Sequence, residues 1–185
     1  CQYPSLFWSN AELDLMEGGE FWLSENPRLH RSKSWDSAFP RMMSYARFVQ
    51  KSSGRHLWAA VTHLDNKGVE ARRHQAEMVR AWVLARDAPV VVLGDFNDAP
   101  GSATHGILTR SSTPLYDTWG LVGGAEDETG KTRHGFDGVP QKTRMDWILV
   151  SGDFEARGVR VVRDHHRGRY PSDHFPLLAD LDWAS

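Results

Sequence analysis

Val90–Asp98 reads VVVLGDFND: four apolar residues and a glycine, followed by two aspartates and an asparagine around one phenylalanine. A run of β-branched and aliphatic residues that stops at Gly94 predicts a buried strand. Alternate side chains of an extended segment point to opposite faces, so we expect Asp95 and Asn97 on one side and Phe96 in the core. The strand therefore predicts a rigid polar edge, a setting that suits binding and catalysis.

The segments around this strand predict a mixed α and β fold. His56–Asp65 (HLWAAVTHLD) has apolar residues on both faces and predicts a strand covered on two sides. Val69–Ala85 has an apolar stripe opposite its charges and predicts an amphipathic helix. Gly18 and Gly19 predict a turn between two short strands within residues 13–23. Further strands are expected over residues 41–50, 144–151, 158–164 and 175–183.

Length and composition predict one globular domain. The chain has 185 residues, 40% of them hydrophobic and 25% charged, which is enough to bury a core. A net charge of -2 argues against a protein that coats DNA. The single cysteine, Cys1, excludes an intrachain disulfide and a multi-cysteine zinc site. Such low cysteine content is typical of proteins in a reducing compartment and favours the cytoplasm. A leader could nevertheless precede this chain, because the chain starts without Met.

No segment approaches the ~20 consecutive apolar residues of a membrane span, so no membrane span is expected. The sequence leaves the oligomeric state open.

Three more polar clusters lie at the ends of predicted strands. Thr62–Asp65 (THLD) carries a histidine that could donate to an anionic oxygen or be an ordinary surface residue. Arg144–Ile148 (RMDWI) places an aspartate in an apolar strand, where a carboxylate needs a partner. That partner is either Arg144, in a structural role, or a histidine whose ring the acid orients. Ser172–His174 (SDH) supplies such a histidine.

Residues 95–98 also have a plain structural interpretation. Asp and Asn often form Asx turns, and such a turn would lead into a helix that begins near Ser102. A carboxylate beside an amide also suits the joint binding of a hard cation, a water molecule and a phosphoryl oxygen. The sequence of this segment leaves both interpretations open.

The motifs THLD, GDFND, RMDWI and SDH, in this order and with GGEFWLSENP upstream, resemble the endonuclease/exonuclease/phosphatase superfamily. The resemblance covers nearly the whole chain. It implies the α+β class and the four-layer α/β/β/α sandwich of the DNase I-like fold, built by one domain over residues 1–185. It also implies a hydrolase that uses Mg²⁺ or Mn²⁺ and in-line attack of water on a phosphodiester or phosphomonoester.

The resemblance assigns roles to the motif residues. His174 would act as the general base or polarise the phosphate, and Asp146 would hold its tautomer. Asp95 would position or deprotonate the attacking water, and Asn97 would bind phosphoryl oxygens. His63 would stabilise developing charge. Whether Asp95 or His174 takes the proton stays open.

The metal site is where the chain departs from the superfamily. Asp173 would contact the metal, but members also carry an N-terminal portion with a strand-end Asn and a metal-binding Glu, and neither appears here in a matching context. We therefore expect a domain truncated at its N-terminus that lacks one or two strands and a helix. Metal affinity should be poor, because Asp95 and Asp173 alone offer few oxygen ligands. A catalytically impaired fragment or a non-catalytic phosphate-binding remnant is the alternative function.

Residues 131–136 (KTRHGF) predict a loop that reaches the site, and a solvated loop is the alternative. We expect Arg41, His134 and Phe136 to contact the substrate, with cations for phosphate and Phe136 for stacking on a base. The partner is then a phosphorylated small molecule or a nucleic acid. Duplex DNA is disfavoured, because the net charge is acidic and no long basic insertion is present.

Overall fold

The computed structural model describes residues 3–113 and 115–185, so Cys1 lies outside the described residues. The strands are β1 (Leu13–Trp22), β2 (Met42–Gln50), β3 (His56–His63), β4 (Val90–Asp95), β5 (Leu115–Asp117), β6 (Asp146–Ser151), β7 (Phe154–Val161) and β8 (Leu177–Trp183). The helices are α1 (Val69–Leu84), α2 (Ala103–Thr109) and α3 (Thr118–Leu121). The strand predicted at Val90, the long helix and the later strands are confirmed.

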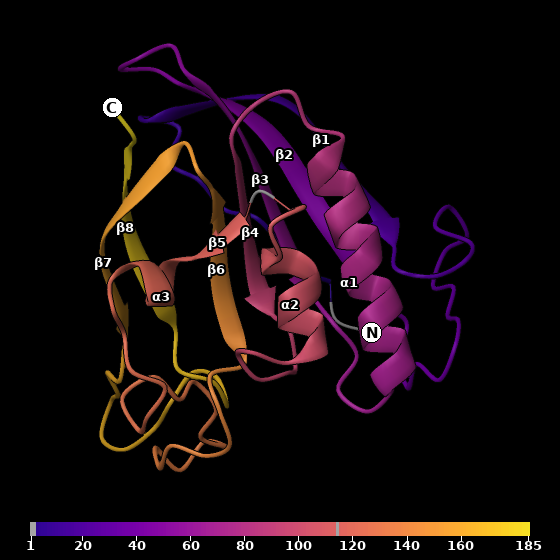
Figure 1. Ribbon diagram of the computed structural model, residues 1–185. Helices are drawn as coiled ribbons and strands as arrows, with labels where there is room; N and C mark the ends of the chain where they lie inside the picture. The colour runs from indigo at the N-terminus through magenta and orange to yellow at the C-terminus, as the bar shows by residue number, and fades with distance from the viewer. Residues whose placement is uncertain (1–2, 114) are drawn as a thin grey trace.

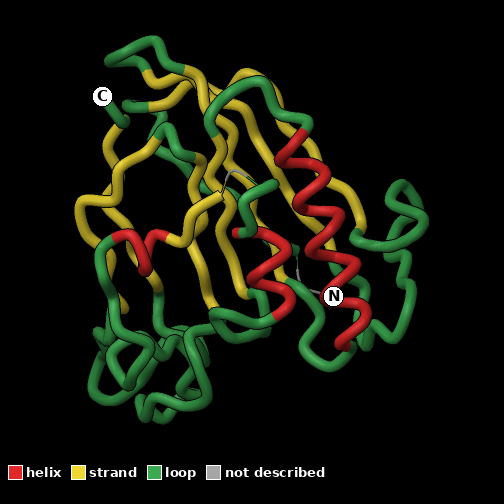
Figure 2. The backbone as a smooth tube through the Cα atoms, viewed as in Figure 1, coloured by secondary structure: helices red, strands yellow, loops and turns green. Residues whose placement is uncertain are grey.

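Two sheets and one layer of helices make up the fold (Figure 1). The larger sheet has the order β1-β2-β3-β4-β6-β5, and β7 pairs with β8 in a second sheet. Strands β3 and β4 are parallel and are connected by α1, whereas the neighbouring pairs are antiparallel. Several long loops gather at one end of the strands (Figure 2).

Helices α1 and α2 cover one face of the larger sheet (Figure 1). From α1, Ala76, Val79 and Val83 are buried in a cluster that also contains Val92 of β4 and Leu149 of β6. Burial of such side chains is the main favourable term in folding. None of the described helices has both the length and the apolar content needed to cross a membrane.

The other face of the larger sheet packs against β7 and β8. Val91 and Val150 form a second apolar cluster with Phe154, and Leu57 and Trp183 pack against it. The described residues therefore form three of the four expected layers, because the helices longer than one turn, α1 and α2, both lie on the first face. Strand β3 is covered on two sides as predicted, although its residues on this second face are only partly buried.

The expected turn at Gly18 and Gly19 is wrong, because both glycines lie inside the continuous strand β1. They pair with Ala46 and Tyr45 of β2. A Cβ on Gly19 would lie 2.6 Å from the Tyr45 hydroxyl oxygen. The glycines therefore make room for the tyrosine ring against the strand instead of turning the chain.

Gly94 has a steric role at the end of β4. It lies opposite Thr62 of β3, and its φ of 143° is in a region that other residues rarely adopt. A Cβ at this position would lie 1.9 Å from the Thr62 carbonyl oxygen. Only glycine therefore allows the two parallel strands to run together up to their carboxyl ends.

We expect Gly94→Ala to lower the free energy of unfolding by about 3 kcal/mol, because it combines a backbone clash with a strained φ. Gly106→Ala is the matched control, since no described residue beyond its own helical turn has an atom within 4 Å of a Cβ built at Gly106 in α2. There the change should raise stability by up to about 1 kcal/mol. Urea unfolding followed by tryptophan fluorescence measures both, and equal midpoints for Gly94→Ala and the wild type would contradict the clash.

Candidate active site

Three predicted site residues form a row across neighbouring strands. His63 at the end of β3 is the register partner of Asp95 at the end of β4. Asp95 is in turn the partner of Asp146, the first residue of the antiparallel strand β6. All three lie on the face that Leu93 and Ile148 share, toward the second sheet. Motifs far apart in the sequence therefore meet because of strand register.

His174 completes the row from the segment before β8. Its Nδ1 is 2.7 Å from Asp146 Oδ2. Burial lowers the pKa of His174, but the hydrogen bond to Asp146 and the negative charge of that residue outweigh burial, so the pKa lies above its ordinary value. Burial also raises the pKa of Asp146, and the hydrogen bond with His174 only partly offsets this. The proton between His174 Nδ1 and Asp146 Oδ2 is therefore held more readily than it would be by either group alone.

His63 and Asp95 make a second pair, with Nε2 of the histidine 3.2 Å from Oδ2 of the aspartate. Burial raises the pKa of Asp95, but the hydrogen bond from His63 and the positive charges of His63 and His174 outweigh it and leave the pKa below its ordinary value. Asp95 and Asp146 are adjacent carboxylates whose pKa values shift in opposite directions. Such divergence is common where two acids have different tasks.

Asn97 lies where the chain leaves β4. Its backbone N–H donates to Asp95 Oδ1 at 2.8 Å, which closes an Asx turn. Its side-chain amide donates to the Leu64 carbonyl oxygen at 3.0 Å. Its φ of 52° is left-handed, a conformation that asparagine tolerates better than most residues. Phe96 is buried as predicted, and Ser102 caps α2, so the Asx turn and the helix cap exist alongside a polar edge.

Thr132 connects the two segments that carry Asp146 and His174. Its buried hydroxyl accepts from the backbone N–H groups of Met145 and Asp146, at 3.1 and 3.3 Å. Its carbonyl oxygen accepts from the N–H of Phe175 at 2.7 Å. Thr132 therefore fixes the start of β6 beside the residue that follows His174.

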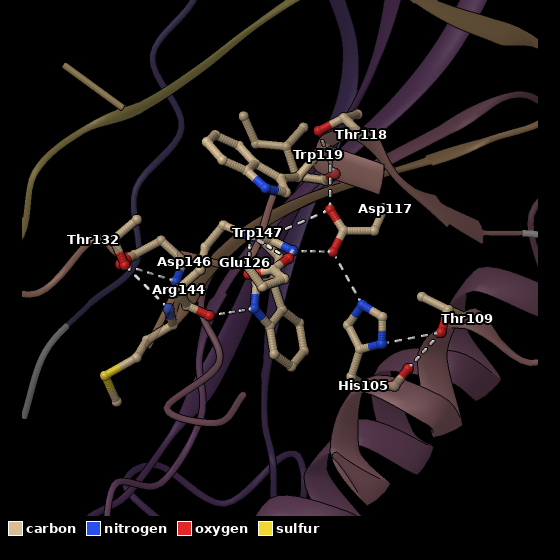
Figure 3. A network of polar contacts seen from close by, with 12 residues as sticks. His105, Thr109, Asp117, Thr118, Trp119, Glu126, Thr132, Arg144, Asp146 and Trp147 are labelled. Carbon is tan, nitrogen blue, oxygen red and sulfur yellow. Dashed lines mark hydrogen bonds and ion pairs between the residues drawn. The ribbon is translucent and has the colours of Figure 1, made fainter. Parts of the chain in front are cut away.

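Arg144 does not pair with Asp146, which settles the choice between the two partners in favour of His174. Its guanidinium donates to both carboxylate oxygens of Asp117, at 3.2 and 2.8 Å, and also to Glu126 (Figure 3). Burial lowers the pKa of Arg144, but these two acids outweigh it and raise the pKa above its ordinary value.

The Arg144 network reaches further behind the site. Asp117 also binds His105 Nε2 of α2 at 3.0 Å, and Arg144 lies over the ring of Trp119 (Figure 3). A buried cation needs such partners, since an unpaired one is strongly destabilising. The network anchors the chain two residues before Asp146 and thereby supports the position of that acid.

Arg41 lies in the cleft wall and is almost fully buried, with Nε 3.7 Å from Asp65 Oδ2. Burial raises the pKa of Asp65, but backbone N–H groups of Gly68, Lys67 and Phe39 outweigh it and lower the pKa to about 2. Because the pKa is lowered, Asp65 stabilises the fold above its ordinary pKa of about 4 and loses that effect as the pH falls toward 2.

The motif residues open into a cleft of about 590 Å³. It is lined by Phe39, Arg41, His63, Asn66, Asp95, Asn97, Arg133, Lys142, Asp146, Ser172, Asp173 and His174. A hollow of equal volume lies at the other end of β3, around His56 and Trp183. Because the four motifs meet in the first cleft, we locate the candidate chemistry there.

Two of the residues expected to contact the substrate, His134 and Phe136, do not line the cleft. His134 is fully buried, stacked on Phe175 with ring centroids 3.9 Å apart. Phe136 is exposed and does not line the cleft. The loop does reach the cleft, but through Arg133 and Lys142. Alternation along the extended segment could have identified Arg133 from the sequence, whereas nothing local marked Lys142.

The side chains that could share a metal ion are Asp95, Asp146 and His174, whose ligand atoms lie within 4.8 Å of one another. Two carboxylates and an imidazole fit a divalent cation, and the carboxylate oxygens suit Mg²⁺ or Mn²⁺. Asp173, the residue expected to contact the metal, lines the cleft but is not in this group.

Comparison with protein-family models matches residues 6–174 to the Endonuclease/Exonuclease/phosphatase family. Among curated proteins, the uncharacterised protein YbhP of Escherichia coli K12 is 30% identical over 172 residues. That match covers 86% of this chain and 60% of YbhP, so the chain spans less than two thirds of its relative.

Solved structures share the fold. A mannosyl-6-phosphatase from Bacteroides thetaiotaomicron matches with a TM-score of 0.80 and 27% identity, over 95% of this chain and 69% of that chain. An endonuclease/exonuclease/phosphatase from Bacteroides vulgatus matches with a TM-score of 0.84 and 26% identity, over 96% of this chain and 69% of that chain. These matches confirm the expected α+β sandwich.

Thr132→Val should lower the free energy of unfolding by about 1–3 kcal/mol, because it leaves the buried N–H of Met145 and the partly buried N–H of Asp146 without this acceptor. Thr132→Ser keeps the hydroxyl and should retain most of the stability. Urea unfolding of the three proteins measures the difference. Equal losses in the valine and serine variants would contradict the role assigned to the hydroxyl, because the serine variant keeps that group.

Asp146→Asn should lower the pKa of His174, because it removes the largest influence that holds that pKa up. The upward direction of the pKa shift also affects stability. Protonated His174 stabilises the fold below the ordinary histidine pKa of about 6.5, and this stabilisation is lost as the pH rises through the pKa of His174 in the folded protein. NMR titration of the imidazole in metal-free protein measures the pKa. Asp173→Asn is the matched control and should lower it by less, and an unchanged pKa in Asp146→Asn would contradict the pairing.

Proposed function

The chain belongs to the endonuclease/exonuclease/phosphatase family, and we propose that it hydrolyses a phosphate ester with water as the nucleophile. One observation carries this proposal: two histidine–carboxylate pairs, His63 with Asp95 and His174 with Asp146, face one cleft. Acids and bases with displaced pKa values in a cleft are typical of catalytic sites. The similarity to a mannosyl-6-phosphatase supports a phosphorylated small molecule as the substrate, ahead of a nucleic acid.

The pKa directions favour His174 over Asp95 as the group that transfers the proton. The raised pKa of His174 makes its imidazole a stronger proton acceptor than that of an ordinary histidine, as a general base requires. The lowered pKa of Asp95 keeps it ionised, so it accepts hydrogen bonds from water but holds a proton poorly. We therefore assign orientation of the attacking water to Asp95. Because Nδ1 of His174 is bound to Asp146, Nε2 is the nitrogen that exchanges the proton.

Other side chains in the cleft are suited to binding the phosphoryl group. Asn97 uses one N–H of its amide on Leu64, and the amide carries a second N–H for a phosphoryl oxygen. His63 lines the same cleft and its ring offers a further N–H donor. Donors already fixed in place stabilise developing negative charge without reorganisation.

A divalent cation, Mg²⁺ or Mn²⁺, would neutralise charge on the phosphoryl oxygens when bound. We propose Asp95 and Asp146 as the carboxylates that hold it, since their oxygens lie in the one group able to share an ion among the described residues. Asp173 lines the same cleft and adds negative charge that favours a cation there.

Hydrolysis of bis-p-nitrophenyl phosphate with Mg²⁺ or Mn²⁺ tests the proposed function. We expect turnover that requires the cation and that falls about a hundredfold to ten-thousandfold in His174→Ala. His56→Ala is the matched control, because His56 is exposed at the other end of β3. Parallel assays with p-nitrophenyl phosphate distinguish a phosphodiesterase from a phosphomonoesterase.

Two results would count against the proposal. Turnover that survives His174→Ala would overturn the assignment of the proton-transfer residue. If the wild-type chain shows no turnover and calorimetry detects no binding of Mn²⁺, the chain is better described as a phosphate-binding remnant of the fold.

A further inference from the structure

The loop between α3 and β6 brings an arginine into the cleft beside the catalytic row. Arg133 forms isolated antiparallel bridges with both Gln141 and His174, so its backbone runs next to the segment that carries the dyad histidine. Thr132 and His134, on either side of it, are fully buried. In an extended segment the residue between them points the opposite way. Arg133 therefore points into the cleft, which it lines.

Arg133 is oriented by a neutral partner. Its Nη1 donates to Gln141 Oε1 at 3.2 Å. The amide nitrogen of Gln141 donates to the His134 carbonyl oxygen and to Asp137 Oδ2, at 3.3 and 3.2 Å, which fixes the glutamine. Over residues 3–113 and 115–185, no carboxylate forms an ion pair with Arg133. The guanidinium is thus held in place with its charge uncompensated.

Lys142 is the second cation that this loop contributes to the cleft. Its φ of 58° is left-handed, a strained conformation for a residue with a side chain. Within the described part of the chain, no hydrogen bond or ion pair engages its ammonium group. Lys142 follows Gln141, the bridge partner of Arg133, so the two uncompensated cations lie on adjacent strands of one loop.

We propose that Arg133 and Lys142 form a subsite for a second phosphoryl group, so that the preferred substrate carries two phosphoryl groups. This inference rests on the proposed function, because it assumes that the row around His174 receives the group that is hydrolysed. The acids of that row are already paired with histidines, whereas these two cations have no anionic partner. Arginine and lysine are the residues that bind phosphate most directly. A cleft of about 590 Å³ has room for such a substrate.

Calorimetry on metal-free protein tests the subsite without relying on turnover. The probes are fructose 1,6-bisphosphate and fructose 6-phosphate, which differ by one phosphoryl group. We expect the bisphosphate to bind about tenfold to a hundredfold more tightly, as one or two charge-assisted hydrogen bonds allow. Arg133→Met and Lys142→Met should each weaken its binding about tenfold, and the double variant should bind both sugars with similar affinity.

Arg157→Met is the matched control, because it also removes one cation but lies on β7, outside the cleft. It should leave the preference for the bisphosphate unchanged. A single-stranded oligothymidylate of about eight nucleotides separates the two sources of a second phosphoryl group. Tighter binding of the oligonucleotide than of the bisphosphate, lost in the double variant, would assign the subsite to the neighbouring phosphate of a nucleic acid.

Equal binding of the two sugar phosphates by the wild type would overturn the subsite if the oligonucleotide also fails to bind through Arg133 and Lys142. A preference that persists in the double variant would overturn it too. Failure of the proposed function is seen separately, as absence of cation-dependent hydrolysis in a protein that still distinguishes the two sugars.

Discussion

The close approach of β3 and β4 at Gly94 is the constraint on which the candidate site depends. A side chain there would meet the Thr62 carbonyl oxygen at 1.9 Å, so only glycine lets the two parallel strands stay paired to their ends. One residue later, His63 and Asp95 are register partners, and the ladder to β6 places Asp146 beside them. The row of polar side chains follows from strand register, which burial of the apolar face holds in place.

Charge in this row is arranged in pairs. Each of the two carboxylates binds one imidazole, and the two acids differ in the direction of their pKa shifts: Asp95 is lowered and Asp146 is raised. Adjacent carboxylates repel, so the stronger acid remains ionised and the weaker one shares the proton of its histidine. The result is one ionised carboxylate within 4.8 Å of the histidine–carboxylate pair to which we assign the proton transfer.

The dyad is supported from behind by polar groups that would be costly to leave unpaired. Thr132 accepts from two backbone N–H groups at the start of β6, and Arg144 is neutralised by Asp117 and Glu126 (Figure 3). These contacts tie a long loop to the sheet edge. Because that same loop carries Arg133 and Lys142, its anchoring links the end of the cleft where we propose hydrolysis with the end that we assign to substrate recognition.

The sequence by itself determined the long helix, the four motifs at strand ends and most of the strands, though not the continuous β1, because periodicity and strand-ending glycines act locally. It also placed Phe96 in the core. Only the tertiary structure decided that Asp146 pairs with His174 and not with Arg144, since both were candidates and the choice depends on contacts across 28 positions. It likewise decided that His134 is buried. Alternation predicts only that neighbouring side chains point to opposite faces, and the packing of His134 on Phe175, before β8, selects Arg133 as the one that faces the cleft.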